Sequence, residues 1–194
     1  MAMARAKEYE REEVLDRAVS VFWAKGFEAT SMSDLVKATG LNTFSMYREF
    51  GSKEGLFEAA MESYYRSWLR AMVDPLVAAP GLSAIRAFFG KFPDMVASRD
   101  FMGCLFMNTL AEKNVVGKKA VDRVAEFCDE LSGLLEHSIL AAQKAGEIPR
   151  DKDAKALSRF LLCVVEGLVL HGRVCNDKAE IRNILATAVE TVEG

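Results

Sequence analysis

Side chains that can contact nucleic acid gather in the stretch TGLNTFSMYREFGSKEGLF, residues 39–57. Asn42, a residue type that caps helix N-termini, begins a predicted short helix that runs to about Glu49 between two glycine turns. Hydroxyl, aromatic and guanidinium groups suit contacts with phosphates and base edges, and a short helix anchored at both ends would hold them rigidly. The side chains of this kind that we expect to point outward are Thr43, Phe44, Ser45, Tyr47 and Arg48.

Two earlier helices are predicted to position this short helix. Residues 10–25 carry apolar side chains at helical spacing and end at Gly26, which we expect to be a left-handed cap. Ser31 and Asp34 have the spacing of a capping box at the start of a second helix. The second and third helices, joined by a glycine turn, have the arrangement of a helix-turn-helix, whose second helix enters the major groove of DNA. The residues predicted to form the core of this unit are Phe22, Leu35, Leu41, Met46 and Phe50.

Charge alone does not point to nucleic acid. The chain has a net charge of −3, and residues 1–57 hold eight basic and nine acidic side chains. An alternative therefore stays open, in which Tyr47 packs into the core and Arg48 with Glu49 forms a solvated ion pair. The prediction of DNA binding rests on local geometry.

The rest of the chain is also predicted to be helical. Ser52 should cap a fourth helix that begins at Lys53 and runs to about Val73, before Asp74-Pro75. Because no alternating strand pattern occurs, we expect an all-α protein of about nine helices. The later segments with apolar residues at helical spacing are 82–98, 104–113, 118–145, 151–175 and 177–192.

Composition and spacing exclude several classes of protein. With 51% hydrophobic and 27% charged residues, the chain is expected to be globular. The N-terminus lacks an apolar signal-peptide core, and no apolar run reaches the roughly 18 residues that span a bilayer, so we expect a cytoplasmic protein without membrane contact. The four cysteines contain no CxxC pair, and no nucleophile-elbow or phosphate-binding glycine pattern occurs. We therefore predict no metal site, no cofactor and no enzymatic activity.

The run from Val14 to Phe57 resembles the N-terminal domain of the TetR (tetracycline-repressor) family of transcriptional regulators. The residues that carry the resemblance are Gly26-Phe27, Thr30-Ser-Met-Ser-Asp-Leu, Gly40, Tyr47 and Phe50-Gly51-Ser52-Lys53-Glu54. It implies a DNA-binding domain in residues 1–52 and a ligand-binding and dimerisation domain in residues 53–194. The function it implies is that of a homodimeric regulator, most often a repressor released from a palindromic operator by a small, largely apolar molecule.

The resemblance also implies roles for individual residues. Tyr47 and Lys53 would contact phosphates, Lys53 at a helix N-terminus that itself favours an anion. Thr43, Ser45 and Arg48 would face the groove, and so would Phe44. The family commonly has a small basic-plus-glycine pair at positions 43 and 44, so this chain would lack one polar contact. Its phenylalanine would instead touch a thymine methyl group.

The C-terminal helices carry apolar stripes that suggest subunit pairing. A helix that is apolar on so much of its surface must be covered on two sides. Four such helices from two subunits would form a bundle about a twofold axis. The alternative is that both helices only close the core of their own subunit. The first stripe of the helix at residues 151–175 is Ala154, Leu157, Leu161, Val164 and Leu168, and the second stripe beside it is Phe160, Cys163, Gly167 and Val174. The stripe of the last helix is Ile181, Ile184, Leu185, Ala188 and Val192.

A concentration of phenylalanine and methionine between residues 88 and 107 suits an adaptable apolar pocket, although these are also ordinary core residues. Polar residues expected among apolar neighbours would orient a ligand there. The predicted ligand-binding residues are Phe88, Phe92, Met95, Cys104, Met107, Asn108, His137 and Glu166.

Cys104 supports an alternative mode of regulation. It follows Gly103 at a predicted helix start, where the helix dipole would lower the thiol pKa and raise its reactivity. The protein would then sense oxidants or electrophiles through Cys104 in place of a bound ligand. The other reading is that Cys104 is a buried cysteine that acts as a small apolar residue.

Overall fold

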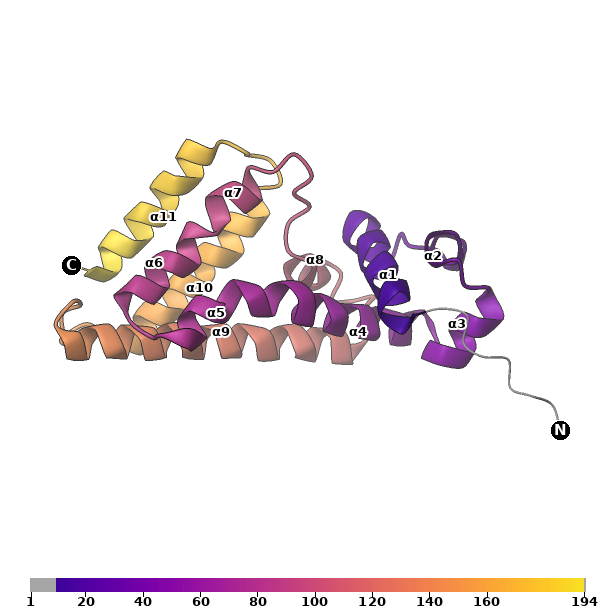
Figure 1. The fold of residues 1–194 in the computed structure, drawn as a ribbon, viewed down its shortest axis with the longest axis horizontal. Coiled ribbons are helices and arrows are strands. Elements are labelled where there is room, and N and C mark those ends of the chain that lie inside the picture. Colours follow the sequence, from indigo (N-terminus) through magenta and orange to yellow (C-terminus); the bar gives the residue numbers. More distant parts are fainter. Residues whose placement is uncertain (1–9, 194) are drawn as a thin grey trace.

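The computed structural model describes residues 10–193, and every regular element in that range is a helix (Figure 1). The prediction of an all-α fold is confirmed. The helix α4 continues through a π-helical turn into α5, and only Lys91 separates α6 from α7, so the described range forms nine helical rods. The bounds are α1 Arg11–Lys25, α2 Met32–Thr39, α3 Thr43–Phe50, α4 Lys53–Tyr64, π-turn Tyr65–Leu69, α5 Arg70–Ala78, α6 Leu82–Gly90, α7 Phe92–Val96, α8 Leu105–Ala111, α9 Lys118–Ala145, α10 Ala154–His171 and α11 Lys178–Glu193.

The first three helices form a small head at one end of an elongated molecule (Figure 1). Four of its predicted core residues, Phe22, Leu35, Leu41 and Met46, are buried, and Phe50 packs partly buried against them. The N-terminal half of α4 packs against α1, where the Phe57 ring lies 4.9 Å from that of Phe22. Because α4 contacts the head and then continues into the larger domain, it joins the two parts physically. The first nine residues of the predicted domain 1–52 lie outside the described residues.

The prediction that the fourth helix ends near Val73 was wrong, because the helix continues through Pro75 to Ala78. Proline has no N–H group to donate to the carbonyl four residues earlier, which here is that of Ala71. The Lys91 ammonium group, from the junction of α6 and α7, donates a hydrogen bond to this free carbonyl. A contact from a distant part of the chain therefore satisfies the group that the proline leaves unpaired.

The larger domain is built along α9, with α4 and α5 on one side and α10 packed beside it (Figure 1). The helix α11 covers α7, α10 and α6. Its predicted pairing stripe is mostly buried in its own subunit, which corrects the expectation that this stripe faces a second subunit. The buried members are Ile181, Leu185, Ala188 and Val192. Among the described residues, each helix is too short or too polar to cross a membrane.

Candidate DNA-binding surface and ligand cavity

The turn between α2 and α3 is fixed by local hydrogen bonds. Gly40 adopts a left-handed conformation (φ +74°), which a residue without Cβ reaches at no steric cost, and its N–H donates to Val36 at 3.0 Å. The buried Thr39 hydroxyl donates to the Leu35 carbonyl at 2.7 Å and accepts from the Leu41 amide at 3.2 Å. The Asn42 side chain accepts from the Ser45 amide at 2.9 Å, which confirms the predicted cap. These bonds set the direction in which α3 leaves α2.

The helix α3 presents an exposed aromatic and basic surface. Thr43 and Arg48 are exposed, Phe44 is 73% exposed and Tyr47 is 48% exposed. The Arg48 guanidinium carbon lies 5.9 Å from the Phe44 ring centroid, so the two side chains cover the same side of the helix. Ser45 is half-buried. The exposure of Tyr47 contradicts the alternative that it packs into the core.

The acidic neighbour of Arg48 is engaged with α1. The Glu49 carboxylate lies 3.4 Å from the Arg11 guanidinium, whose carbon is 5.5 Å from the Phe50 ring centroid. This pairing offsets a negative charge that would otherwise oppose phosphates near α3.

Lys53 lies at the N-terminus of α4, close to the loop between α1 and α2. The Ser52 hydroxyl accepts from the Gly55 amide at 3.1 Å and confirms the predicted cap. The Lys53 ammonium nitrogen is 4.4 Å from the Phe27 ring centroid and 3.4 Å from the Glu28 carbonyl oxygen. The loop between α1 and α2 therefore holds the Lys53 ammonium group in place. The N-terminus of α4, where this group lies, itself favours a bound anion such as a phosphate.

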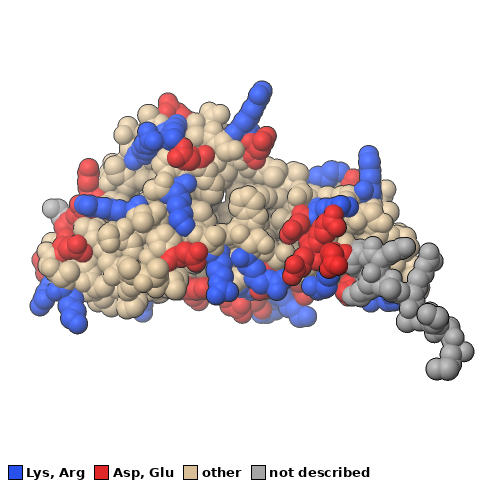
Figure 2. Space-filling model, in the orientation of Figure 1, with Lys and Arg blue, Asp and Glu red and all other residues tan. Residues whose placement is uncertain are grey.

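Acidic side chains gather over α1 on the face drawn in Figure 2. The exposed acids at the start of that helix are Glu12, Glu13 and Asp16. A phosphate backbone approaching this face would meet like charge. The candidate DNA-binding surface, α3 and the start of α4, does not include this acidic part of α1.

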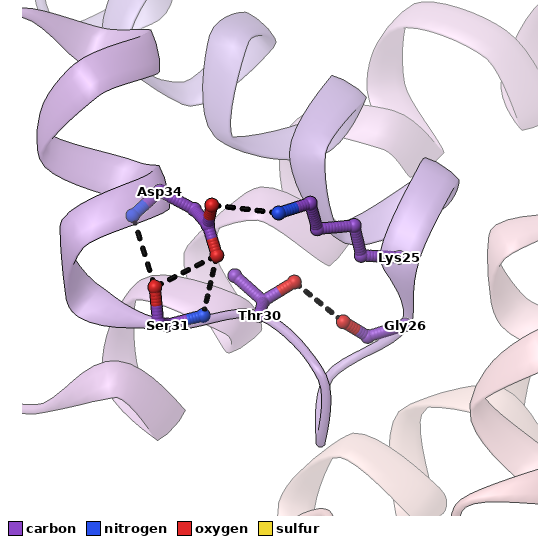
Figure 3. A network of polar contacts seen from close by, with 5 residues as sticks. All are labelled: Lys25, Gly26, Thr30, Ser31 and Asp34. Carbon is purple, nitrogen blue, oxygen red and sulfur yellow. Dashed lines mark hydrogen bonds and ion pairs between the residues drawn. The ribbon is translucent and has the colours of Figure 1, made fainter.

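The loop that leads into α2 is held by a network drawn in Figure 3. Ser31 and Asp34 form the predicted capping box, and Lys25 donates to the Asp34 carboxylate at 2.6 Å. The Lys25 hydrogen bond, followed by those from the Ser31 amide and hydroxyl, holds the pKa of Asp34 well below its usual range. The Thr30 hydroxyl donates to the Gly26 carbonyl at 2.6 Å. Gly26 has a positive φ of +82° with an extended ψ of 171°, so it is not the left-handed cap predicted from the sequence.

A largely apolar cavity lies inside the larger domain and reaches the head. It offers about 90 Å³ to the centres of water-sized molecules, several times the ~10–15 Å³ that one water needs. Six of the eight predicted ligand-binding residues line it, namely Phe88, Phe92, Met95, Cys104, Met107 and Glu166. The structure therefore brings together residues from α6, α7, α8 and α10 that are far apart in the sequence.

The structure places the two other predicted ligand residues outside the cavity. His137 is exposed, because the buried face of α9 is formed by neighbours such as Leu135 and Ser138. Asn108 points to the backbone, where its amide donates to the Met102 carbonyl at 3.0 Å and its oxygen accepts from Arg173 at 3.4 Å. Both predictions of cavity lining are corrected.

Sequence reasoning missed the aromatic wall of the cavity. Trp23 of α1, Tyr64 of α4 and Trp68 of the π-helical turn all line it. The Trp23 ring lies 5.2 Å from that of Tyr64 and 5.7 Å from that of Trp68. The cluster YYRSW at residues 64–68 was a visible signal, and π-helical turns often occur at functional sites.

The two cysteines in the cavity wall are held as neutral thiols. Burial raises the pKa of Cys104, although the Met107 amide and the Tyr64 hydroxyl act in the opposite direction. Burial, together with the nearby Glu166 carboxylate, raises the pKa of Cys128 to about 12. The prediction that the helix N-terminus lowers the pKa of Cys104 was wrong, because desolvation of the thiolate outweighs the amides.

Two sets of hydrogen bonds connect the cavity region to the head. The Trp23 indole N–H donates to the Gly103 carbonyl at 3.2 Å, and both residues line the cavity. The Glu112 carboxylate, at the end of α8, accepts from the amides of Phe27 at 2.8 Å and Glu28 at 2.9 Å. These hydrogen bonds join the end of α8 to the loop that precedes α2.

Comparisons with known proteins agree with this architecture. A family model described as bacterial regulatory proteins, tetR family, matches residues 14–60, and a tetracyclin repressor-like C-terminal domain model matches residues 81–188. The helical head with an exposed third helix and the helical domain behind it thus define a DNA-binding transcriptional regulator. The chain belongs to the TetR family.

Named relatives cover nearly the whole chain. The HTH-type transcriptional repressor ComR of Escherichia coli (strain K12) is 28% identical over 188 residues, which are 95% of this chain and 90% of ComR. The uncharacterized regulator YezE of Bacillus subtilis (strain 168) is 31% identical over 82% of this chain and 84% of its own length. The solved structure of a CifR cysteine mutant with a 26-base-pair operator DNA has a TM-score of 0.83 at 27% identity, covering 96% of this chain and 98% of that one.

Proposed function

We propose that this chain is a cytoplasmic, homodimeric repressor that leaves a palindromic operator when a small, largely apolar molecule enters the cavity. The observation that carries the proposal is that Trp23, a residue of the DNA-binding head, forms part of the cavity wall. A ligand there touches the head and the larger domain at once. Its affinity then depends on the angle between them, and this differential affinity is what shifts a conformational equilibrium.

The proposed DNA contacts divide into two kinds. Tyr47 and Lys53 contact phosphates, and they set the position of the head on the duplex. Thr43, Ser45 and Arg48 face the groove, where Arg48 reaches a base edge. The exposed Phe44 ring gives an apolar contact, which suits a thymine methyl group.

Subunit pairing is proposed to use the second stripe of α10. The first stripe of that helix, around Leu161 and Leu168, is buried in its own subunit, whereas Phe160 and Cys163 of the second are exposed. Leu170 and Val174 extend the exposed apolar surface with 65% and 87% exposure. Contiguous exposed apolar surface of this kind typically marks an interface. Pairing here would fix the separation of the two α3 helices, which must match one DNA turn of about 34–36 Å.

The chemistry of the cavity limits the ligand. Aromatic rings, thioethers and aliphatic side chains form most of its wall, so a compact apolar body fits. The Glu166 carboxylate is the charged group in the wall and accepts a hydrogen bond from the Cys128 thiol at 3.5 Å. We therefore propose that the ligand carries a hydrogen-bond donor or a cationic group that faces Glu166.

The links from Trp23 to Gly103 and from Glu112 to the loop after α1 are proposed to carry the release. A ligand that enlarges the cavity would move α8, and the head would rotate with it. A shift of a few ångströms in the separation of two reading helices breaks phosphate contacts on one half-site. The buried, neutral Cys104 does not favour the alternative of a thiol switch, because the thiolate is the reactive form.

The chain contains its own reporter for ligand binding. Both of its tryptophans, Trp23 and Trp68, line the cavity, so an apolar ligand should change the intrinsic fluorescence. Compounds found in a fluorescence screen would then be added to the protein bound to a duplex selected from random sequences. We expect a palindromic duplex, two chains per duplex, and at least a tenfold loss of DNA affinity with ligand.

A cavity-filling variant provides the control for this experiment. Met107→Phe should abolish the fluorescence response and the ligand effect while DNA binding is kept, whereas Leu140→Phe on the exposed side of α9 should behave like the original chain. A strictly monomeric protein with no preference for any palindrome at low salt contradicts the proposed repressor. Ligand release that survives in Met107→Phe contradicts the proposed cavity.

A further inference from the structure

Three side chains with metal-binding atoms converge where α10 ends and α11 begins. His171 is the last residue of α10, Cys175 lies in the connecting loop, and Glu180 lies in the first turn of α11. Their ligand atoms all lie within 4.8 Å of one another, and the His171 Nε2 atom is 3.0 Å from a Glu180 carboxylate oxygen. We propose that these three residues bind a borderline transition-metal ion, such as Zn²⁺ or Co²⁺.

The distances suit an ion after small side-chain rotations. With metal–ligand bonds of ~2.0–2.3 Å, the ligand atoms of a tetrahedral site lie about 3.3–3.8 Å apart. The histidine and glutamate are slightly closer than this in the structure, and the thiol is within reach. The His171 and Glu180 side chains are 41% and 50% exposed, so an ion can enter from solvent. Binding would replace their mutual hydrogen bond with two metal–ligand bonds.

The donor set selects the metal. An imidazole nitrogen, a thiolate sulfur and a carboxylate oxygen are the three ligand types of zinc sites, whereas Mg²⁺ and Ca²⁺ take oxygen ligands. Three protein ligands leave a fourth position for water or a small anion, which is the arrangement of an open site. We therefore expect Zn²⁺ and Co²⁺ to bind and Mg²⁺ to have no effect.

The surrounding structure holds the backbone of the site. A Cβ atom at Gly172 would lie 2.2 Å from Val96 Cγ1 and 2.9 Å from the Phe101 ring. The turn after His171 therefore packs directly against residues 96–101. The His171 carbonyl accepts from the Cys175 amide at 3.0 Å, which folds the loop back toward the helix end. The histidine and the thiol are therefore brought together before any ion binds.

Nearby charged groups are engaged elsewhere. Lys178 forms an ion pair with Asp94 on α7. The Asp177 carboxylate caps α11 by accepting from the Ala179 amide at 2.8 Å and from the Glu180 amide at 3.3 Å. The Glu180 side chain is thus not needed as the cap of its own helix. The absence of a CxxC pair predicted that the chain has no metal site. The order His-x3-Cys-x4-Glu becomes a candidate site only when the loop between α10 and α11 folds.

The test is a Co²⁺ titration of the full chain, without an affinity tag and in a reductant that does not bind metals. A thiolate ligand gives a sulfur-to-cobalt charge-transfer band in the near ultraviolet, and the d–d bands of the ion report its geometry. We expect one Co²⁺ per chain, displacement by Zn²⁺ and none by Mg²⁺. The measurement uses no DNA, so its outcome is independent of the proposed repressor function.

Matched variants assign the ligands. Cys175→Ser should lose the charge-transfer band, whereas Cys163→Ser, the same change at a thiol outside the three-residue site, should keep it. His171→Gln and Glu180→Gln should each weaken Co²⁺ binding at least about tenfold. Unchanged helical circular dichroism shows that each variant is folded. Absence of the thiolate band in the original chain, or its persistence in Cys175→Ser, overturns the proposal.

Discussion

Replacing Glu112 with glutamine tests the connection between the larger domain and the head. The Glu112 carboxylate accepts two hydrogen bonds from consecutive amides, those of Phe27 and Glu28, at 2.8 and 2.9 Å. It also lies directly against Gly26, where a Cβ atom would be 2.9 Å from a carboxylate oxygen. A glutamine has one oxygen acceptor, and its NH₂ group would face the second amide as donor to donor. One of the two bonds is therefore lost, with little change in side-chain volume.

The magnitude follows from the type of bond. Hydrogen bonds to charged groups contribute about 1.5–3 kcal/mol, and the partial exposure of this pair favours the lower end. About 1.4 kcal/mol corresponds to a factor of ten in an equilibrium constant. We therefore expect Glu112→Gln to increase opening of the loop after α1 about tenfold. The coupling between ligand and DNA binding, transmitted through the same bonds in our proposal, should fall as well.

Amide hydrogen exchange measures this opening directly, because exchange at Phe27 and Glu28 requires their hydrogen bonds to break. Glu147→Gln makes the same chemical change at an exposed position beyond the end of α9 and serves as the control. Exchange at the two amides should accelerate in Glu112→Gln and stay constant in Glu147→Gln. Equal exchange in the two variants would show that the carboxylate does not hold the loop.

Three further experiments test the DNA-binding surface, the loop network around Asp34 and the reactivity of the thiols. Lys53→Ala should lower the slope of log affinity against log salt by about 0.9 for each chain on DNA, and Lys144→Ala, at the far end of α9, should leave it unchanged; titration of both variants with salt decides this. Because the pKa of Asp34 is lowered in the folded protein, its stabilisation is present above the unfolded pKa of about 3.9 and is lost as pH falls below it. Unfolding of Asp34→Asn should show a weaker dependence on pH in that range than the original chain, and an identical dependence would contradict the network. In metal-free protein, the half-buried Cys175 should react with a thiol reagent at neutral pH much faster than the buried Cys104, as mass spectrometry can follow, and fast reaction of Cys104 would restore the thiol switch.

The short-range features of the head were predictable because the interactions that form them span three or four residues. The caps at Ser31, Asn42 and Ser52 and the turn at Gly40 all occur where the sequence places them. Each cap depends on a side chain that accepts a hydrogen bond from a backbone amide two or three residues later, so both partners are neighbours in the sequence. The exposure of Phe44 and Tyr47 follows from the same local pattern, since α3 has one apolar face.

Features that depend on contacts between distant parts of the chain could not be predicted from the sequence pattern. Helicity through Pro75 requires Lys91 from another helix, and the raised pKa of Cys104 requires burial that no local pattern reports. Trp23 belongs to the cavity only because the head packs against α8.

The sequence by itself determined that this chain is helical throughout its described range, that its head is a helix-turn-helix of the TetR family, and which side chains that head exposes. Only the tertiary structure decided which apolar residues surround a cavity, which stripe of α10 remains exposed, and how Glu112 reaches the head. The physical reason is that caps and helical periodicity are set by neighbours in the chain, whereas burial, desolvation and long-range hydrogen bonds depend on how whole helices pack.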